Sequence, residues 1–388
     1  MPALFSPPLA VLDGPAAFDG GASPLDLSVP PELRARARAE IPQWAGYAPT
    51  PLLRLDGMAR ALGVGGVLTK YEAGRFGLGS FKALGGAFAV AQAVCGMTQD
   101  AIAQAVMVTA SDGNHGLSVA WGARRLGCKA TIYLHENVAE SRADLIRAQG
   151  GEVVRVKGNY DDSTHQARAD ALRHGWHLVS DTAIADDDTA PGVVMAGYTV
   201  MMDEIVAELG ESAERPTHVF IQGGCGGLAA AAFGALFEAW GATTFVMVEP
   251  DKADCLYQSA RAGHPVRIEG DLDTVMGGLS VGEVSLTAWK TIQPIVGHYL
   301  TIADSAATET MTALGQGRFG DAPLVVGDAG SAGLAGLIEA ARDPAIRGAL
   351  GLDARSVVLT IVTEGAVDQP GYTAITGIDP MAIAEAAA

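Results

Sequence analysis

Basic residues are scarce in this chain, because 26 Lys and Arg stand against 44 Asp and Glu, a formal net charge of −18. Proteins that bind nucleic acid or an anionic membrane through charge need a basic surface. Long apolar runs are also missing, since glycine, charge or a polar residue breaks each one before it could span a bilayer. We therefore expect no nucleic-acid partner and no membrane contact.

Cysteine is also sparse, with four residues in 388. Cys95, Cys128, Cys225 and Cys255 are widely separated and form no C-x-x-C pair, so the pattern indicates neither a zinc ribbon nor a disulfide framework. We expect reduced thiols and no metal ion. The chain opens without a positively charged, apolar, cleavable leader, and the cytoplasm is the expected compartment.

Hydrophobic residues make up 49% of the 388 residues, which predicts a well-filled interior in two lobes. From about Ala105 onward, short apolar runs alternate with longer amphipathic ones. The runs that we interpret as strands are AVMVTA, KATIYL, EVVRVK, WHLVSD, THVFIQ, TTFVMVEP and VVLTIVTEG. Alternation of this kind predicts an α/β fold in which helices join parallel strands and ligands bind at the carboxyl ends of the strands.

Two stretches interrupt this alternation. The first forty residues are rich in Pro, Gly and Ala, and we expect an irregular arm that wraps the body or contacts a partner subunit. The acidic, proline-containing stretch at residues 185–192 separates the first series of strands and helices from the second, which predicts a domain boundary near residue 195.

Lys82 lies in RFGLGSFKALGGAFAV, between a glycine-rich turn and a segment with a helical pattern. A lysine that forms a Schiff base must lose its proton, and an apolar setting and a nearby positive charge promote that loss. The candidates for the apolar setting are Phe76, Leu78, Phe81 and Leu84. Taken alone, the segment is more typical of a surface lysine at the start of a helix.

A second segment, TASDGNHG, directly follows a predicted strand and precedes a predicted helix. Gly113 and Gly116 permit tight backbone turns there. The polar side chains of this loop are Asp112, Asn114 and His115. They lie at the carboxyl end of a strand, where α/β sheets bind ligands, although a well-made turn with a helix cap explains the loop equally well.

A third segment, QGGCGGLAAA at residues 222–231, follows the strand THVFIQ and opens a long apolar helix. Glycine amides at a helix N-terminus form a pocket for a phosphate group, and the helix dipole adds to the attraction. Gly224, Gly226 and Ala229 also satisfy G-x-G-x-x-A, and Glu249 ends the next strand. A dinucleotide site therefore competes with other phosphate-bearing cofactors, and a close-packing turn is the third interpretation.

Two further strand ends carry polar groups, Asp181 after WHLVS and Thr363 in IVTEG. Each one alone is more typical of a helix cap or a solvated loop residue. Only the whole set of segments changes that assessment.

Taken together and in this order, the segments resemble the fold-type II pyridoxal-5′-phosphate (PLP) enzymes, and more closely the diaminopropionate ammonia-lyase family. The similarity extends from YAPTPLLRL at residues 47–55 to IVTEG near the end of the chain. The pieces most specific to the ammonia-lyases are RFGLGSFKALGG, SDGNHG, GNYDDS, SDTA, AGYTVMMDEI, EPDKADCLYQS and MGGLSVGE. The resemblance implies a tryptophan-synthase-β-like fold of two open, twisted, mostly parallel sheets flanked by helices.

The resemblance also implies a role for each matching residue. Lys82 would carry PLP as a Schiff base, and Asn114 would lie beside the 3′-oxygen of the pyridine ring. Thr363 would face the ring nitrogen, where a neutral hydroxyl favours elimination over transamination. The glycine loop falls where this family binds the cofactor phosphate. The cofactor contacts implied are Lys82, Phe81, Asn114, Gly223, Gly224, Cys225, Gly226, Gly227, Asp328 and Thr363.

The catalytic residues implied are Lys82, Asp112 and Asp181, and the reaction is α,β-elimination from a small 3-substituted amino acid. The leading substrate is 2,3-diaminopropionate, which yields pyruvate and ammonia. The two acids would act on opposite faces, one for each enantiomer, and would pair with a cationic 3-ammonium group. The alternatives are a dehydratase for serine, threonine or 3-hydroxyaspartate, which Asp112 argues against, and a PLP-binding protein without turnover.

The chain departs from the family pattern at several positions. Leu117 and Ser118 follow SDGNHG where ammonia-lyases have Arg-Gly, and AIADDDTAPG replaces an aromatic-containing stretch. Asp328 stands where the family has glutamate, and Cys225 lies inside the glycine loop. These differences surround the substrate more than the cofactor.

The resemblance finally implies a division of the chain into two domains. Residues 1–90 and 196–388 would form the larger, PLP-binding domain with its irregular N-terminal arm. Residues 91–195 would form a smaller, mobile domain on the substrate side. A homodimer is the assembly that the family implies, and the N-terminal arm is compatible with its interface.

Overall fold

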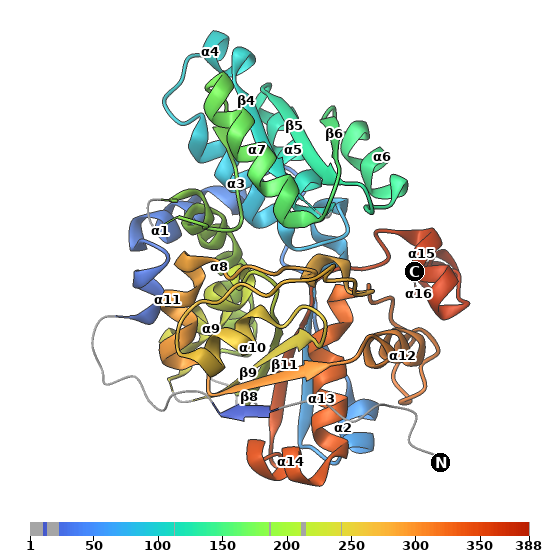
Figure 1. The fold of residues 1–388 in the computed structure, drawn as a ribbon. Helices are drawn as coiled ribbons and strands as arrows, with labels where there is room; N and C mark the ends of the chain where they lie inside the picture. The colour runs from blue at the N-terminus through green and yellow to red at the C-terminus, as the bar shows by residue number, and fades with distance from the viewer. Residues whose placement is uncertain are drawn as a thin grey trace.

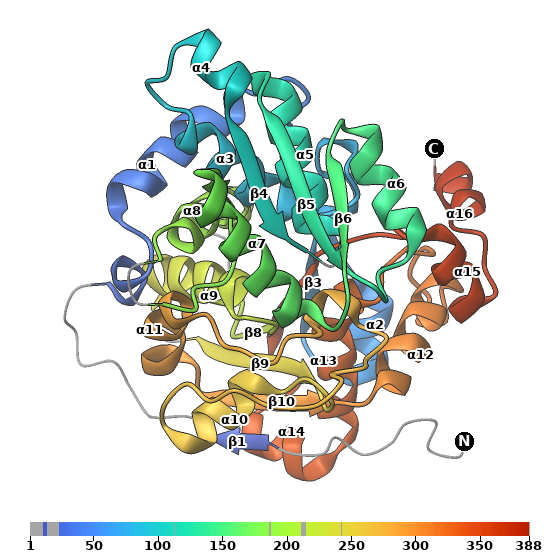
Figure 2. The ribbon, with the colours of Figure 1, turned by 45° about the horizontal axis from the view of Figure 1, so that its top comes forward.

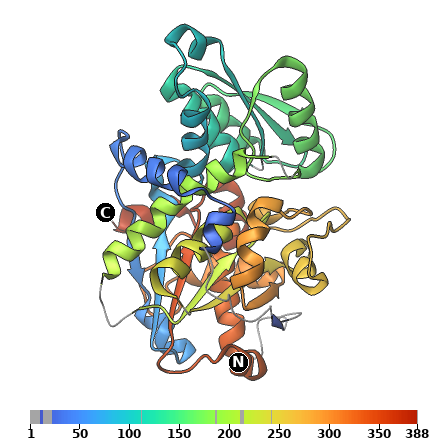
Figure 3. The same cartoon turned by 90° about the vertical axis from the view of Figure 1, so that its left-hand side faces the viewer.

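The computed structural model describes residues 11–13, 23–111, 113–185, 188–210, 215–241 and 243–387. These residues form two β-sheets covered by helices, and the α/β alternation expected from the sequence is confirmed. Figure 1 shows the smaller sheet in the upper lobe and the larger sheet in the lower lobe, and Figure 3 shows the two lobes from the side.

The larger sheet has seven strands, of which the five central ones are parallel and the two edge strands, β1 and β2, are antiparallel to their neighbours. In spatial order the strands are β1 (Val11–Asp13), β10 (His298–Ile302), β9 (Thr244–Pro250), β8 (His218–Gln222), β11 (Val357–Val362), β3 (Gly66–Tyr71) and β2 (Leu52–Arg54). The central strands are almost continuously apolar because helices cover both faces of a parallel sheet.

The smaller sheet has four parallel strands, in the order β6 (Glu152–Val156), β5 (Lys129–His135), β4 (Val106–Ala110) and β7 (His177–Leu178). All four lie between residues 106 and 178, and every strand of the larger sheet lies outside that range. The helix α7 (Tyr160–His174) covers one face and α5 (Asn114–Leu126) the other, as Figures 1 and 2 show.

The remaining helices flank the two sheets or lie between the lobes. Their bounds are α1 (Pro31–Glu40), α2 (Asp56–Leu62), α3 (Lys82–Ala93), α4 (Gln99–Gln104), α6 (Glu140–Ala148), α8 (Ala190–Leu209), α9 (Gly227–Trp240), α10 (Cys255–Ala262), α11 (Leu286–Ile295), α12 (Asp304–Gly315), α13 (Ala332–Arg342), α14 (Pro344–Leu350), α15 (Gln369–Thr376) and α16 (Pro380–Ala387). Within the described ranges, no helix is long and apolar enough to cross a membrane.

The expectation of irregular structure throughout the first forty residues is wrong for residues 31–40. These form α1, which begins with Pro31 at a position where the missing N–H costs nothing. The segment LRARAR that follows consists of strong helix formers, and that local propensity outweighs the proline-rich context. Residues 1–10 and 14–22 lie outside the described residues.

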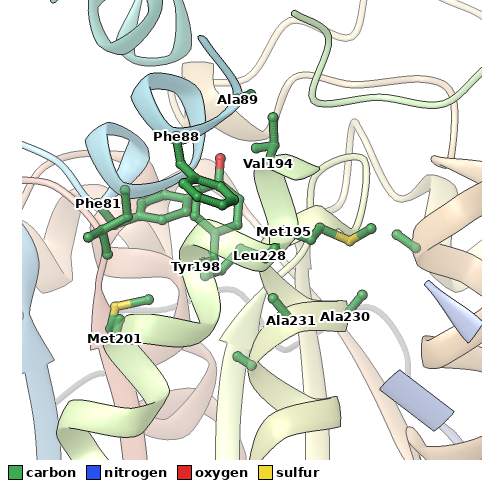
Figure 4. Close-up of a cluster of buried hydrophobic side chains, with 14 of the residues drawn as sticks. Phe81, Phe88, Ala89, Val194, Met195, Tyr198, Met201, Leu228, Ala230 and Ala231 are labelled. Atoms are coloured by element: carbon green, nitrogen blue, oxygen red, sulfur yellow. The ribbon is translucent and has the colours of Figure 1, made fainter. Parts of the chain in front are cut away.

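The helices α3 and α8 pack closely beneath the smaller sheet. A Cβ on Gly197 would lie 2.3 Å from the Leu84 oxygen, and a Cβ on Gly85 would lie 2.4 Å from Tyr198 Cε1, so only glycine allows this approach. Figure 4 shows the aromatic rings of Phe81, Phe88 and Tyr198 together at this junction. The ring centroids of Phe81 and Tyr198 are 4.7 Å apart. This packing fixes the start of α3, where Lys82 lies.

Candidate active site

A cavity lies at the carboxyl ends of strands from both sheets, between the two lobes. Concave pockets with a few convergent polar groups at such a place are typical sites for cofactors and small molecules. Helices α3, α5 and α9 all begin at its wall. The polar residues that line the cavity are Lys82, Ser111, Asn114, His115, Arg142, Tyr160, Asp181, Gln222, Thr363 and Glu364.

Lys82 is the first residue of α3, and its side chain points into the cavity. The backbone N–H of Phe81 donates to the Thr363 oxygen at 3.0 Å, which ties the start of the helix to the end of β11. Lys82 Nζ donates to Asp181 Oδ2 at 2.6 Å. The Phe81 ring lies 5.6 Å from Nζ and supplies part of the apolar wall.

The charged group that the structure places beside Lys82 is a carboxylate. Burial would lower the pKa of Lys82, but the carboxylate of Asp181 raises it above the ordinary value of a lysine. Phe76 was one candidate for the apolar setting of Lys82, but its ring packs against the ring of Trp121, with the two centroids 4.9 Å apart. Lys82 is therefore a cation, 22% exposed, whose proton has an immediate acceptor.

Asp181 follows β7 and is held by residues from both lobes. Its Oδ1 accepts a hydrogen bond from the Tyr160 hydroxyl at 3.1 Å, while Oδ2 faces Lys82. Burial would raise the pKa of Asp181, but the Lys82 ammonium lowers it below the usual range of a carboxyl group. Asp181 is thus a carboxylate at neutral pH, and Tyr160 is a site residue that the sequence reasoning missed.

The loop after β4 brings Asn114 and His115 to the cavity wall. Ser111 Oγ accepts from the backbone N–H groups of Gly113 and Gly116, at 2.9 and 2.8 Å. Gly113 has a φ of +131°, as expected for a tight turn. Gly116, however, lies within α5 and not in a turn, and it is needed because a Cβ there would lie 2.4 Å from a methyl carbon of Ile132.

His115 Nε2 lies 2.8 Å from the Val179 oxygen, and burial lowers the pKa of its imidazole. The ring is therefore neutral and its Nδ1 atom has no hydrogen-bond partner among the described residues. Asp112, the other acid expected at this loop, lies outside the described residues.

Asn114 donates from Nδ2 to Glu364 Oε2, and its Oδ1 atom is buried without a partner among the described residues. Burial raises the pKa of Glu364 to about 8, and the Asp328 carboxylate raises it as well. From the motif IVTEG, Thr363 was predicted as a site residue and Glu364 was not. Glu364 could have been predicted because it is a second polar residue at the same strand end.

Thr363 lies at the end of β11 and is fixed by Gln222 at the end of β8. Gln222 Nε2 donates to Thr363 Oγ1 at 3.0 Å and also to the backbone oxygens of Ala329 and Ile361. Because the Thr363 oxygen accepts this bond, its hydroxyl hydrogen remains available to the cavity. Gln222 is a further residue that the sequence reasoning missed.

The glycine loop leads from β8 into α9. A Cβ on Gly223 would lie 2.8 Å from Leu256 Cδ1, and Gly226 has a φ of +99°, so both positions require glycine. The first helical bond runs from the Ala230 N–H to the Gly226 oxygen, which leaves the N–H groups before Ala230 without partners in the helix. Such a helix start attracts a phosphate group.

Two other residues that were expected to contact the cofactor, Cys225 and Asp328, lie in different surroundings. Cys225 lines the cavity, and its Sγ lies 3.5 Å from the Asp181 backbone oxygen. Asp328 lies beside a neighbouring cavity, where it accepts from the Ala329 N–H at 2.6 Å and pairs with Arg142 at 3.2 Å. Arg142 lines both cavities and was not singled out from the sequence.

Comparison with known proteins identifies this arrangement. Residues 44–364 match the family model described as pyridoxal-phosphate dependent enzyme. The diaminopropionate ammonia-lyase of Escherichia coli (strain K12) is 36% identical over 373 residues, which cover 92% of this chain and 93% of that protein. The chain belongs to the diaminopropionate ammonia-lyase family of PLP enzymes. Its cofactor is therefore pyridoxal 5′-phosphate, and the dinucleotide interpretation of the glycine loop is not favoured.

A solved structure agrees with this membership. The crystal structure of the Escherichia coli diaminopropionate ammonia-lyase, in complex with an aminoacrylate-PLP azomethine reaction intermediate, matches with a TM-score of 0.88 and 34% identity. The match covers 96% of this chain and 98% of that chain. The L-threonine dehydratase of Salmonella typhimurium is a more distant relative, 30% identical over 83% of this chain and 59% of that protein. The expected fold-type II architecture is confirmed.

The residues of the cavity fit the cofactor. PLP has an aldehyde, a phenolic oxygen, a ring nitrogen and a phosphate, and the cavity offers an amine, an amide, a hydroxyl and a helix N-terminus. Several buried polar atoms of the wall have no partner among the described residues, as a site for a polar ligand requires. These atoms are Asn114 Oδ1, His115 Nδ1, Gln222 Oε1 and Glu364 Oε1.

Proposed function

We propose that this enzyme catalyses the α,β-elimination of 2,3-diaminopropionate to pyruvate and ammonia. The observation that carries the proposal is the ion pair of Lys82 and Asp181, whose Nζ and Oδ2 atoms lie 2.6 Å apart in a cavity where the glycine-rich start of α9 offers a place for a phosphate group. Elimination needs a base at the α-carbon, and a carboxylate beside the reactive lysine is in the position for that role. Family membership supports the choice of substrate.

The binding groups follow from the geometry of the wall. PLP, when bound, supplies an electron-withdrawing ring that acidifies the α-proton of an amino acid attached to it. We propose that the Gly223–Gly227 loop holds the phosphate, with Asn114 and Thr363 at the ring. Thr363 offers a neutral hydroxyl to the ring nitrogen, which leaves that nitrogen largely unprotonated and suits elimination over transamination.

Proton movement is assigned to Lys82 and Asp181. Lys82 must lose a proton before its nitrogen becomes a nucleophile, and Asp181 Oδ2 already accepts a hydrogen bond from that proton. With an amino acid bound at the cofactor in place of the Lys82 amine, the same carboxylate would face the substrate and would take the proton from its α-carbon. The Tyr160 hydroxyl holds Asp181 in position throughout.

Recognition of the second amino group is assigned to carboxylates. Among the described residues of the wall, Asp181 and Glu364 carry carboxyl groups, and only Asp181 has a pKa low enough to stay charged at pH 7. Asp181 is therefore the proposed partner of the 3-ammonium group of one enantiomer. Asp112 is the proposed counterpart for the other enantiomer.

The test compares both enantiomers of 2,3-diaminopropionate by pyruvate release. We expect Lys82→Ala to abolish activity and the visible band of the bound cofactor, while Lys252→Ala, at an exposed lysine paired with Asp304, changes neither. Asp181→Asn lowers kcat for one enantiomer by at least about a hundredfold, the usual contribution of a general base. Asp112→Asn does the same for the other enantiomer.

The matched control for the acids is Asp170→Asn, at a carboxylate that accepts from a tyrosine hydroxyl away from the cavity. Full activity of Asp112→Asn on both enantiomers contradicts the assignment of the two faces. The enzyme belongs to the dehydratases instead if the cofactor band is present and diaminopropionate yields no pyruvate, while serine, threonine or 3-hydroxyaspartate is turned over.

We also propose that the enzyme works in the cytoplasm as a homodimer, with residues 91–195 as the smaller, mobile domain and residues 1–90 and 196–388 as the larger one. The family implies the dimer. The four cysteines are free, which agrees with a reducing compartment. Light scattering of the purified enzyme tests the assembly, since a monomer at micromolar concentration contradicts it.

A further inference from the structure

Glu364 is a buried carboxyl group for which the reaction outlined above has no use. It follows β11 and Thr363, and its side chain is 2% exposed. One oxygen, Oε2, accepts from Asn114 Nδ2, and the other, Oε1, lies in the cavity wall without a partner among the described residues. Burying a carboxyl group with one oxygen that makes no hydrogen bond costs stability, and such a group therefore calls for an explanation.

The surrounding backbone holds Glu364 in a single place. The Glu364 oxygen accepts from the Gly327 N–H at 3.0 Å, and the residue also forms an isolated antiparallel bridge with Ser80, two residues before Lys82. A Cβ on Gly327 would lie 2.8 Å from Glu364 Cγ, and a Cβ on Gly330 would lie 3.3 Å from it. The two glycines therefore make room for the side chain and fix its direction.

We propose that Glu364 is a positioning residue that orients the Asn114 amide toward the cofactor ring. An amide nitrogen carries two N–H bonds. Glu364 takes one of them, which fixes the plane of the Asn114 amide and leaves the second N–H to donate to the phenolic oxygen of the ring. This role rests on the proposed place of Asn114 in the cofactor site.

The charges around Glu364 agree with this role. The side chains that face it are Asn114 from α5, Arg142 from α6, with Nη1 4.0 Å from Oε2, and Asp328. Burial and the Asp328 carboxylate raise the pKa of Glu364 to about 8 against the lowering effect of Arg142 and Asn114, which favours the neutral form at pH 7. A neutral acceptor holds Asn114 without placing an anion beside an electron-rich ring oxygen. Above pH 8 that anion forms.

The experiment measures PLP binding to the apoprotein by its visible spectrum, with kcat for diaminopropionate alongside. We expect Glu364→Ala to weaken PLP binding about tenfold, the effect of losing one well-placed hydrogen bond, and to shift the cofactor band. Glu364→Gln keeps an acceptor oxygen and stays within about threefold of the parent at pH 7. We also expect Glu364→Gln to lack the spectral transition near pH 8 that titration of Glu364 would give the parent.

A double-mutant cycle separates positioning from general stability. If Glu364 acts through Asn114, then Glu364→Ala has no further effect on PLP binding in an Asn114→Ala background. Glu339→Gln is the control, because Glu339 is also a buried glutamate with one oxygen that has no hydrogen-bond partner within the described part of the chain, but it lies on α13 away from the cavity.

Three outcomes would overturn the proposal. They are an unchanged PLP affinity and spectrum in Glu364→Ala, an equal loss with and without Asn114, and a Glu364→Gln variant as impaired as Glu364→Ala. If Glu364→Ala does not fold, the spectra of Glu364→Gln decide the matter from pH 6 to 9. None of these readouts needs turnover, so a failure of the proposed substrate leaves the test intact.

Discussion

At the scale of single residues, the Asp181 carboxylate is the best-defined part of the site. The Tyr160 hydroxyl donates to its Oδ1 at 3.1 Å, and this bond comes from the N-terminal turn of α7 in the other half of the cavity wall. We expect Tyr160→Phe to lower kcat about fivefold, because a lost hydrogen bond of about 1 kcal/mol lets the carboxylate leave its working position. Measurement of kcat with each enantiomer of diaminopropionate tests this prediction.

The loss should be larger for the enantiomer whose α-proton Asp181 removes, because the proton transfer from Lys82 is common to both enantiomers. Tyr133→Phe is the matched control, because Tyr133 makes the same kind of bond to Asp170, at 2.8 Å, on the outer side of the smaller sheet. Equal losses for both enantiomers, or an equal loss in the control variant, would count against a positioning role of Tyr160.

Glu249 is a second buried carboxyl group, and its effect is on stability. It accepts from the backbone N–H groups of Leu256 and Tyr257 at 2.9 and 2.7 Å. Burial raises its pKa from 4.5 to about 8, so between these pH values the folded protein binds more protons than the unfolded chain. The free energy of unfolding therefore falls as pH rises through this window, by at most about 1.4 kcal/mol per pH unit.

Glu249→Gln removes this titration and keeps one acceptor oxygen. We expect the Tm of the cofactor-free variant to fall less between pH 5 and pH 8.5 than the Tm of the parent. Glu152→Gln, at an exposed position on β6, is the control and should follow the parent. If the Tm of the variant falls as steeply as that of the parent, the titration of Glu249 does not control the pH dependence of stability.

What the sequence could predict at this scale depended on distance along the chain. Lys82, Asn114 and Thr363 stand in short motifs at strand or helix ends, and their roles were predicted from the resemblance of these motifs to a known family. The pairing of Lys82 with Asp181 joins positions 99 residues apart, so the sequence pattern predicted neither the carboxylate neighbour nor the direction of the Lys82 pKa shift. Glu364 was missed for the same reason, since its partner Asn114 is 250 residues away.

At the scale of helices and strands, the sequence predicted what hydrophobic periodicity controls. The strands β4 to β9 and β11 were predicted where apolar runs end at polar residues, and the cavity lies at ends of these strands. The strands β1, β2, β3 and β10 of the larger sheet were not predicted. Composition misled at α1, where residues 31–40 were expected to be irregular. The prediction for Gly116 was also wrong. It was expected in a turn, but it lies within α5, where the absence of a side chain allows close packing against Ile132.

The close approach of α3 and α8 predicts a strong effect of a single methyl group. Gly197→Ala places a carbon 2.3 Å from the Leu84 oxygen, so the helices must separate, and overpacking of this kind costs about 1 to 3 kcal/mol. Because α3 begins at Lys82, we also expect weaker PLP binding. Denaturant unfolding and a PLP titration measure the two effects.

Gly348→Ala is the matched control for Gly197→Ala. Gly348 lies within α14, and a Cβ there meets nothing within 4 Å. We expect that variant to be as stable as the parent or up to about 1 kcal/mol more stable, since alanine is the better helix former. A Gly197→Ala variant of parental stability would show that the two helices are not in contact in solution.

At the scale of the whole molecule, the order of the strands explains why the site lies between the lobes. The order β1-β10-β9-β8-β11-β3-β2 brings the ends of β8 and β11, far apart in sequence, next to each other. Sequence alternation predicts parallel strands but not their order, because many crossovers satisfy the same pattern. The motifs that line the cavity could therefore be predicted from the sequence, but which of them lie next to each other could not.

Polar contacts on two sides of the cavity join the lobes. Ser141 of α6 donates to Asp368 Oδ1 at 2.9 Å, and Asp161 of α7 lies 3.7 Å from Arg267, which also pairs with Glu283. Burial and the Glu283 carboxylate raise the pKa of Asp161 to about 6, so its pair with Arg267 is lost as pH falls through that value.

If the smaller domain moves, these two contacts hold it closed over the substrate. Polar contacts near the surface contribute about 0.2 to 1 kcal/mol each. We expect a Ser141→Ala and Arg267→Ala double variant to raise KM about fivefold with less than a twofold change in kcat, and to speed hydrogen exchange in α6 and at the start of α7. Arg355→Ala, which breaks an exposed pair with Asp353 inside the larger lobe, should do neither. Parental KM and exchange in the double variant would mean that other contacts keep the lobes together.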